Sequence, residues 1–175
     1  MSVIQGRKAT RLASWAAALA VASALAVGTP VPVSAAAPDF KIELDAGVGC
    51  AFPLRVEGTG DKRIMRQFTD RNGNVVRLLS AGKGFTLTFT NLSPGGESLT
   101  LSSNGSVERT TVNSDGTSTV VSTGHNVLIL FPTDIPAGPS TTLYVGQIVY
   151  TVDTSGVFTL QSTSGTTTDL CALLA

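Results

Sequence analysis

Residues 85–90 read Phe-Thr-Leu-Thr-Phe-Thr, and their pattern is the clearest indication of the fold class. Its apolar side chains alternate with threonines, which is the period of two expected of a β-strand with one buried and one exposed face. Threonine and aromatic residues are also favoured in strands. Segments with similar alternation lie on both sides of it, and residues 36–175 contain no convincing helical pattern, so we expect an all-β domain.

Glycine-containing turn signals separate the strand-like segments. Asn-Gly and Asp-Gly pairs tolerate the positive φ angles that tight hairpins require. Six segments read as turns: Asp70–Asn74, Ala81–Gly84, Asn104-Gly105, Asp115-Gly116, Thr123–Asn126 and Ser155-Gly156. We count about ten strands, joined mostly by hairpins. This arrangement predicts a single antiparallel β-sandwich, with barrel-like closure of the sheet as the alternative.

Two segments fit either a strand or a helix. In Asp61–Phe68, Ile64 and Phe68 are four residues apart, as on one face of a helix, but the segment also fits a strand that carries basic side chains. We predict a strand there. Asp169–Ala175 could form a short terminal helix, but the preceding threonines and an expected disulfide favour a strand.

The first 35 residues have the composition of an export signal. An uncharged apolar run over residues 12–27 follows a basic start, and small residues surround the expected cleavage point after Ala35. The run has 16 residues, whereas a membrane-spanning helix needs roughly 20. We therefore predict a cleaved signal peptide over residues 1–35, no transmembrane anchor, and a mature domain over residues 36–175 that is secreted or associated with the cell envelope.

The two cysteines, Cys50 and Cys171, stand near the two ends of the predicted mature domain. An even number of cysteines in an exported chain predicts a disulfide. The bridge would close a loop of about 120 residues, for which the chain-entropy model gives roughly 4–5 kcal/mol of stabilisation. Two buried free thiols are the alternative.

Charge is distributed unevenly along the predicted mature domain. It has nine Lys and Arg against twelve Asp and Glu, a balance that does not indicate nucleic-acid binding. Residues 55–83 carry a net charge of +4, whereas residues 84–175 carry −5. Such asymmetry can orient a protein on a charged partner. The predicted contact to an anionic wall polymer or to lipid headgroups consists of Lys62, Arg63, Arg66, Arg71 and Arg77.

Candidate catalytic residues are few. His125 is the only histidine, and it would need an orienting carboxylate such as Asp134 and a serine nucleophile brought close by the fold. The chain contains no Gly-x-Ser-x-Gly motif and no phosphate-binding glycine loop. One histidine and two bridged cysteines do not make a zinc site. We predict no cofactor and no metal, and we expect a non-enzymatic protein.

Three functions follow from these observations. The first is an exported binding or structural protein of the envelope or the extracellular space. The second is a secreted hydrolase that uses His125 and Asp134. The third is an inhibitor or interaction partner of another secreted protein, which would present the proline-rich segment 131–139.

Several segments resemble small secreted proteins of high-GC Gram-positive bacteria. They are the alanine-rich export signal, Phe68–Asn74, Gly124–Asp134 and Asp169–Cys171. These proteins are uncharacterised, so the resemblance implies export but no activity, ligand or catalytic residue.

Overall fold

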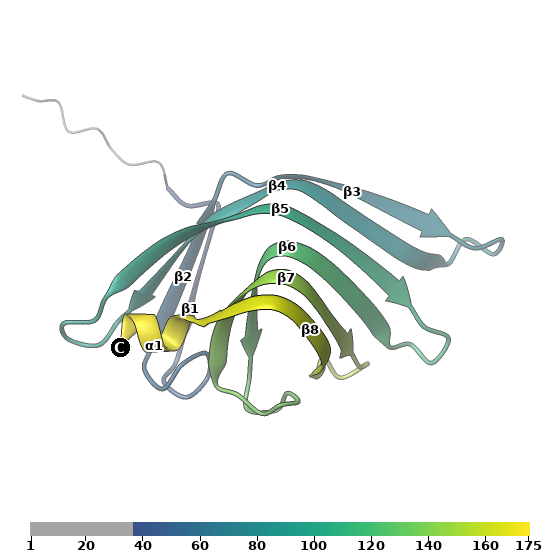
Figure 1. Cartoon of the computed structure of the whole chain (residues 1–175). Helices are drawn as coiled ribbons and strands as arrows, with labels where there is room; N and C mark the ends of the chain where they lie inside the picture. The colour runs from purple at the N-terminus through teal and green to yellow at the C-terminus, as the bar shows by residue number, and fades with distance from the viewer. Residues whose placement is uncertain (1–36) are drawn as a thin grey trace, which may run out of the picture. The chain divides into compact units, whose positions relative to one another are not determined.

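Eight strands and one short helix form the described part of the chain, residues 37–175 of a computed structural model (Figure 1). The predicted signal peptide lies outside the described residues. The elements are β1 (Phe40–Leu44), β2 (Leu54–Thr59), β3 (Lys62–Thr69), β4 (Val75–Asn91), β5 (Ser98–Val112), β6 (Ser118–Leu130), β7 (Ser140–Val152), β8 (Phe158–Asp169) and α1 (Leu170–Leu174). The all-β prediction is confirmed. No helix within residues 37–175 is long and apolar enough to cross a bilayer.

Three of the predicted turns are bends inside long strands, which is why eight strands replace the predicted ten or so. Ala81–Gly84 lies within β4, Asn104-Gly105 within β5 and Thr123–Asn126 within β6. β5 remains paired with β4 on both sides of Gly105, so the chain continues in the same direction. A glycine with positive φ permits either a reversal or a kink, and the neighbouring strand decides between them.

All strand pairs are antiparallel, and together they form one sheet. The order is β1-β2-β4-β5-β6-β7-β8, with β3 paired to β4 beyond the end of β2. The sheet does not close, because β1 and β8 stand at its two ends without pairing to each other. The structure therefore lacks the two separate sheets of the predicted sandwich.

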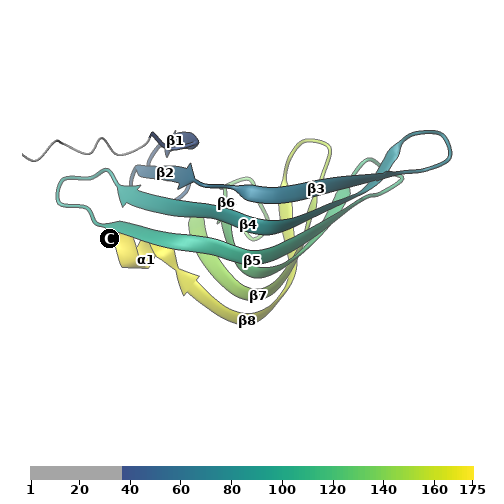
Figure 2. The same cartoon turned by 90° about the horizontal axis from the view of Figure 1, so that it is seen from above.

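The sheet divides at one end because β5 and β6 pair over only part of their length. Val107–Val112 pairs with Ser118–Thr123, but the first half of β5 and the second half of β6 diverge (Figure 2). Apolar side chains from both arms meet between them. This main core contains Cys50, Leu54, Val56, Phe89, Leu170 and Leu174, against which Leu87, Leu101, Val127, Ile129 and Leu143 pack. One continuous sheet thus achieves part of the two-layer packing of a sandwich.

A glycine with positive φ interrupts each of the five longest strands. These residues are Gly82, Gly105, Gly124, Gly146 and Gly165. Gly124 pairs with Gly146, and Gly146 pairs with Gly165 on β8. A Cβ atom on Gly146 would lie only 2.1 Å from the carbonyl oxygen of Ser164. The backbones approach so closely along this line that a side chain does not fit, and β6, β7 and β8 curve strongly (Figure 1).

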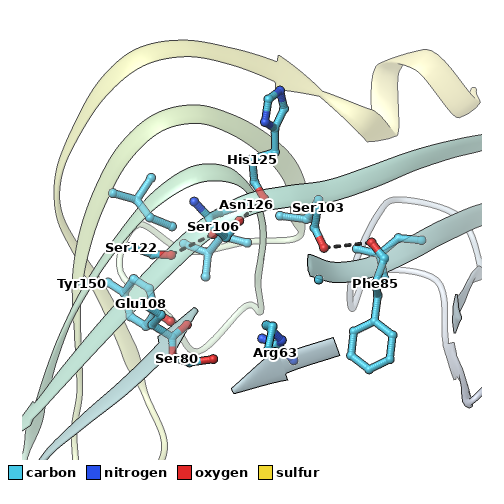
Figure 3. Close-up of a pocket in the computed structure, with 15 residues that line it drawn as sticks. Arg63, Ser80, Phe85, Ser103, Ser106, Glu108, Ser122, His125, Asn126 and Tyr150 are labelled. Carbon is cyan, nitrogen blue, oxygen red and sulfur yellow. Dashed lines mark hydrogen bonds between the residues drawn. The ribbon is translucent and has the colours of Figure 1, made fainter. Parts of the chain in front are cut away.

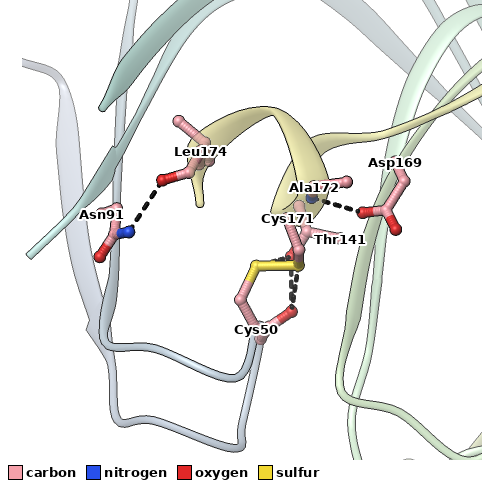
Figure 4. Close-up of a disulfide and its surroundings, with 8 residues drawn as sticks. Cys50, Asn91, Thr141, Asp169, Cys171, Ala172 and Leu174 are labelled. Carbon is pink, nitrogen blue, oxygen red and sulfur yellow. Dashed lines mark hydrogen bonds between the residues drawn. A yellow bond between two sulfur atoms is a disulfide. The ribbon is translucent and has the colours of Figure 1, made fainter. Parts of the chain in front are cut away.

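The predicted disulfide between Cys50 and Cys171 is present, with the two Cα atoms 5.6 Å apart (Figure 4). It ties the segment before β2 to α1. Cys50 is fully buried in the main core. The bridge therefore joins the two arms of the sheet through the C-terminal helix.

The helix α1 corrects the prediction of a strand over the last residues. Asp169 caps it by accepting a hydrogen bond from the Ala172 amide at 3.1 Å, and the Asn91 side chain donates to the Leu174 carbonyl at 2.8 Å (Figure 4). Leu170 and Leu174 are four residues apart and both are buried. A capping aspartate followed by helix-forming residues outweighs the strand tendency of the preceding threonines.

Candidate functional site

Register places side chains of β3, β4 and β5 on a common face of the sheet. Directly paired residues of antiparallel strands point to the same side. Arg66 pairs with Leu79 of β4, and Leu79 pairs with Arg109 of β5. We call this side the cationic face, and its members are Lys62, Ile64, Arg66, Phe68, Arg77, Leu79, Ala81, Lys83, Val107, Arg109 and Thr111. It holds five cations and no carboxylate.

Within residues 37–175, the cations of this face have no ionic partner. The ion pairs within residues 37–175 join Lys41 and Arg55 to Glu43, and Arg63 to Asp61. None of them involves a cation of the cationic face. Their charge is therefore not neutralised by neighbouring carboxylates and acts on the solvent or on a partner.

Large apolar side chains stand among these cations. Ile64 is 69% exposed, Phe68 45% and Val107 43%. β3 itself is an edge strand on which every residue is exposed. An apolar patch rimmed by charged residues is typical of an interaction surface.

The predicted basic cluster is divided by the fold. Lys62, Arg66 and Arg77 come together on the cationic face. Arg63 points to the opposite side, because it pairs with Gly82 one position out of phase, and it forms a salt bridge with Asp61. Arg71 lies in the turn between β3 and β4.

Two cations of the cationic face were missing from the predicted cluster. Lys83 pairs with Lys62 across the β3–β4 hairpin. Arg109 of β5 pairs with Leu79 of β4, which in turn pairs with Arg66 of β3. Arg109 is the one basic residue of the acidic second half of the chain. Only the β4–β5 register reveals that it joins the others, because nothing in the local sequence links it to β3.

A cavity of about 180 Å³ lies on the opposite face, next to the point where β6 diverges from β5 (Figure 3). A cross-strand row of Ser80, Glu108, Ser122 and Ile148 contributes to its wall. Arg63 and His125 also line it and are exposed, so the cavity lies at the surface of the molecule. No signal in the sequence predicts this cavity, because its wall comes from five different strands.

One buried side-chain atom in the cavity wall has no hydrogen-bond partner within residues 37–175. The Ser122 hydroxyl donates to Asn126 Oδ1 at 2.7 Å, whereas Asn126 Nδ2 is buried and makes no hydrogen bond within the described chain. Exchanging the two amide atoms would leave the oxygen without a partner instead. A buried polar atom without a partner costs about 1–3 kcal/mol, so this amide lacks a hydrogen-bonding group that the cavity could hold.

The charged residues of the cavity are unequally compensated. Arg63 makes a bidentate contact with Asp61, at 2.9 Å from Nε and 3.0 Å from Nη2, and its guanidinium lies over the Phe85 ring. Glu108 has no ion pair with another described residue. The hydrogen-bonded Asp61, and to a smaller extent Glu108, raise the pKa of Arg63. The cavity therefore offers one available carboxylate next to an arginine that is already paired.

Tyr150 lines the cavity and provides a spectroscopic probe of it. Burial, helped by the nearby Glu108 charge, raises the pKa of Tyr150 from 10.0 to about 12. Burial also raises the pKa of Tyr144. A group with a raised folded-state pKa stabilises the fold below its unfolded pKa, and this stability is lost as pH rises from 10 towards 12.

We therefore expect both tyrosines to ionise above pH 10 in the folded protein, with Tyr150 titrating last. Ultraviolet absorbance of tyrosinate during an alkaline titration measures this, and Tyr150→Phe assigns the later transition. Ionisation of both residues near pH 10 while the protein is folded would contradict the burial of Tyr150.

The structure does not connect His125 with Asp134. The His125 ring is directed away from the other labelled cavity residues, and its backbone carbonyl accepts a hydrogen bond from Ser106 (Figure 3). Asp134 is only 3% exposed, and its two carboxylate oxygens accept hydrogen bonds from the amides of Phe131 and Phe158. These contacts give Asp134 a role in holding the segment after β6, and the geometry offers no support for a hydrolase built on this pair.

The proline-rich segment 131–139 is anchored to the edge strand β8. Ile135 forms a parallel bridge with Thr159, its amide donates to the Phe158 carbonyl, and its carbonyl accepts from the Leu160 amide. The Ile135 side chain is nevertheless 58% exposed. The segment is therefore fixed in place and presents one apolar side chain.

The aspartates of the hairpin turns serve the turns themselves. Asp70 accepts hydrogen bonds from the amides of Asn72 and Asn74 and from the Asn74 side chain, which together hold its pKa below the usual value. Asp153 accepts three hydrogen bonds from Ser155 and Val157 in the same way. Within residues 37–175, no three His, Cys, Asp or Glu side chains are grouped as metal ligands would be.

Comparison of the chain with protein-family models, with curated proteins and with solved structures gave no match.

Proposed function

We propose that this chain is an exported binding protein that docks onto an anionic lipid surface of the cell envelope through its cationic face. The observation that carries the proposal is the set of five cations without a carboxylate, namely Lys62, Arg66, Arg77, Lys83 and Arg109. Each Lys or Arg near an anionic bilayer contributes about 1 kcal/mol of attraction.

The apolar residues among the cations favour lipid over a soluble polymer. Ile64 and Phe68 alternate with Lys62 and Arg66 on one exposed edge strand. Transfer of such side chains from water into the boundary between headgroups and acyl chains is favourable and strengthens membrane binding. A purely ionic contact to a wall polymer would not use them. The disulfide supports the export on which this function depends, because such bridges persist in oxidising compartments.

Sedimentation with phospholipid vesicles tests the proposal. The folded domain should bind vesicles that contain an anionic lipid, bind vesicles of phosphatidylcholine alone weakly, and lose affinity as salt is raised. Arg66→Gln combined with Arg109→Gln should weaken binding about 30-fold, because roughly 2 kcal/mol of attraction is removed.

A charge-matched control distinguishes an effect of the cationic face on vesicle binding from an effect of the net charge of the protein. Lys41→Gln combined with Arg55→Gln removes the same charge from β1 and β2, at positions that are not members of this face, and it should leave vesicle binding nearly unchanged. Equal losses in both double variants, or no binding at low salt, would overturn the proposal.

A second variant separates a lipid surface from an anionic polymer. Ile64→Ser combined with Phe68→Ser keeps every charge and removes two exposed apolar side chains. It should weaken vesicle binding and leave binding to soluble polyphosphate unchanged. If polyphosphate binds as tightly as the anionic vesicles and this variant has no effect on either, the partner is a polymer.

A further inference from the structure

From the geometry of the cavity we infer a second binding site, separate from the cationic face, that takes one small neutral polyol such as a single sugar ring. Its central groups are Asn126, Glu108 and Tyr150, on three neighbouring strands. The site lies on the opposite side of the sheet from the cationic face, so the two could be occupied independently.

The size of the cavity sets the size of the ligand. A cavity of about 150 Å³ in another protein accommodates benzene, and this cavity measures about 180 Å³. One six-membered ring with its substituents pointing at the wall or the opening is therefore the largest molecule it can enclose.

The unpartnered amide of Asn126 favours a hydroxyl group on the ligand. A hydroxyl both donates and accepts hydrogen bonds, so it can pair with Asn126 whichever amide atom faces the cavity. The same kind of group can donate to Glu108, which has no ion pair among residues 37–175. A molecule with several hydroxyls can make both contacts at once.

Charge within the cavity disfavours an ammonium ligand. Glu108 would attract it, but the Arg63 guanidinium also lines the cavity and would repel it. A carboxylate ligand is also disfavoured, because Glu108 would repel it. The Arg63 guanidinium offers little compensation, since Asp61 already occupies it in a bidentate contact.

The apolar part of the wall suits the carbon–hydrogen surfaces of a sugar ring. Leu87, Val127 and Ile148 line the cavity together with the Phe85 and Tyr150 rings. The Tyr150 ring is held in place by stacking on Phe158, with centroids 5.4 Å apart. An apolar wall with a few fixed polar groups is the usual composition of a small-molecule site.

Nuclear magnetic resonance of the folded domain tests this inference, with the Asn126 side-chain amide and the Glu108 and Tyr150 backbone amides as reporters. The probes are glucose, galactose, inositol and glycerol, with ethanolamine and acetate as charged comparisons. We expect at least one polyol to shift all three reporters saturably, and neither charged probe to do so. Shifts from ethanolamine alone, or from no probe, would overturn the inference and leave a cavity that holds only water.

Two variants locate the contact. Glu108→Gln keeps the shape of the side chain and should weaken binding of the active polyol about tenfold, because a hydrogen bond to a charged carboxylate is replaced by a weaker one to a neutral amide. Glu97→Gln makes the same change in the exposed turn between β4 and β5 and should have no effect. Equal affinity in the wild type and both variants would place the polyol elsewhere. Vesicle binding is unaffected by Glu108→Gln if the two sites are independent.

Discussion

Replacing Gly146 with alanine should lower the free energy of unfolding by more than about 3 kcal/mol, because two separate penalties act at this position. The backbone φ is +144°, a region that L-residues rarely adopt, and the new Cβ atom would lie 2.1 Å from the Ser164 carbonyl oxygen. That oxygen belongs to a strand that cannot move away without breaking the β7–β8 pairing. Urea unfolding followed by circular dichroism measures the loss.

Gly60→Ala is the matched control for this substitution. Gly60 also has positive φ, +77°, but nothing lies within 4 Å of the position its Cβ would occupy. It should cost about 1–2 kcal/mol from backbone strain alone. If both variants lose the same stability, the close approach of β7 and β8 at Gly146 does not exist in solution.

Strand character could be predicted from the sequence, but the role of each glycine with positive φ could not. Alternation in residues 85–90 predicted the strand character of the domain correctly, because a half-buried strand has a local signature. Local sequence does not distinguish a glycine that reverses the chain, such as Gly116, from one that bends a continuing strand, such as Gly105. The difference lies in which strand provides the next hydrogen bond, and that is a long-range property.

The candidate sites could be predicted even less well, because they depend on the register between strands that are far apart in the sequence. Arg63 and Arg66 are three residues apart on β3, and successive strand residues point to opposite sides. Because this spacing is an odd number, Arg63 faces the cavity and Arg66 lies on the cationic face. The sequence predicted the basic character of β3 but not which cations act together. The Asn126 amide carried no local signal at all, because its missing partner is a property of the assembled cavity.

Removing the disulfide should produce the other large loss of stability, about 2–5 kcal/mol in the double variant Cys50→Ala with Cys171→Ala. The bridge closes a loop with a sequence separation of 121 residues, so it restricts the unfolded chain strongly. In the folded protein it fixes α1 between the arms of the sheet, where Leu170 and Leu174 complete the main core. We therefore expect urea unfolding at a lower midpoint, with α1 the first element to lose protection from hydrogen exchange.

Reduction of the wild-type protein separates the crosslink from the packing of the two sulfur atoms. Dithiothreitol breaks the bond but leaves both side chains in place, so reduced wild type should retain slightly more stability than the double alanine variant, which also leaves a small cavity beside Leu54 and Leu174. Both should be well below the oxidised protein. An unchanged unfolding midpoint after complete reduction would mean that α1 is held by its caps and leucines alone. In that case Asn91→Ala, which removes the bond to the Leu174 carbonyl, should release the helix in the reduced protein.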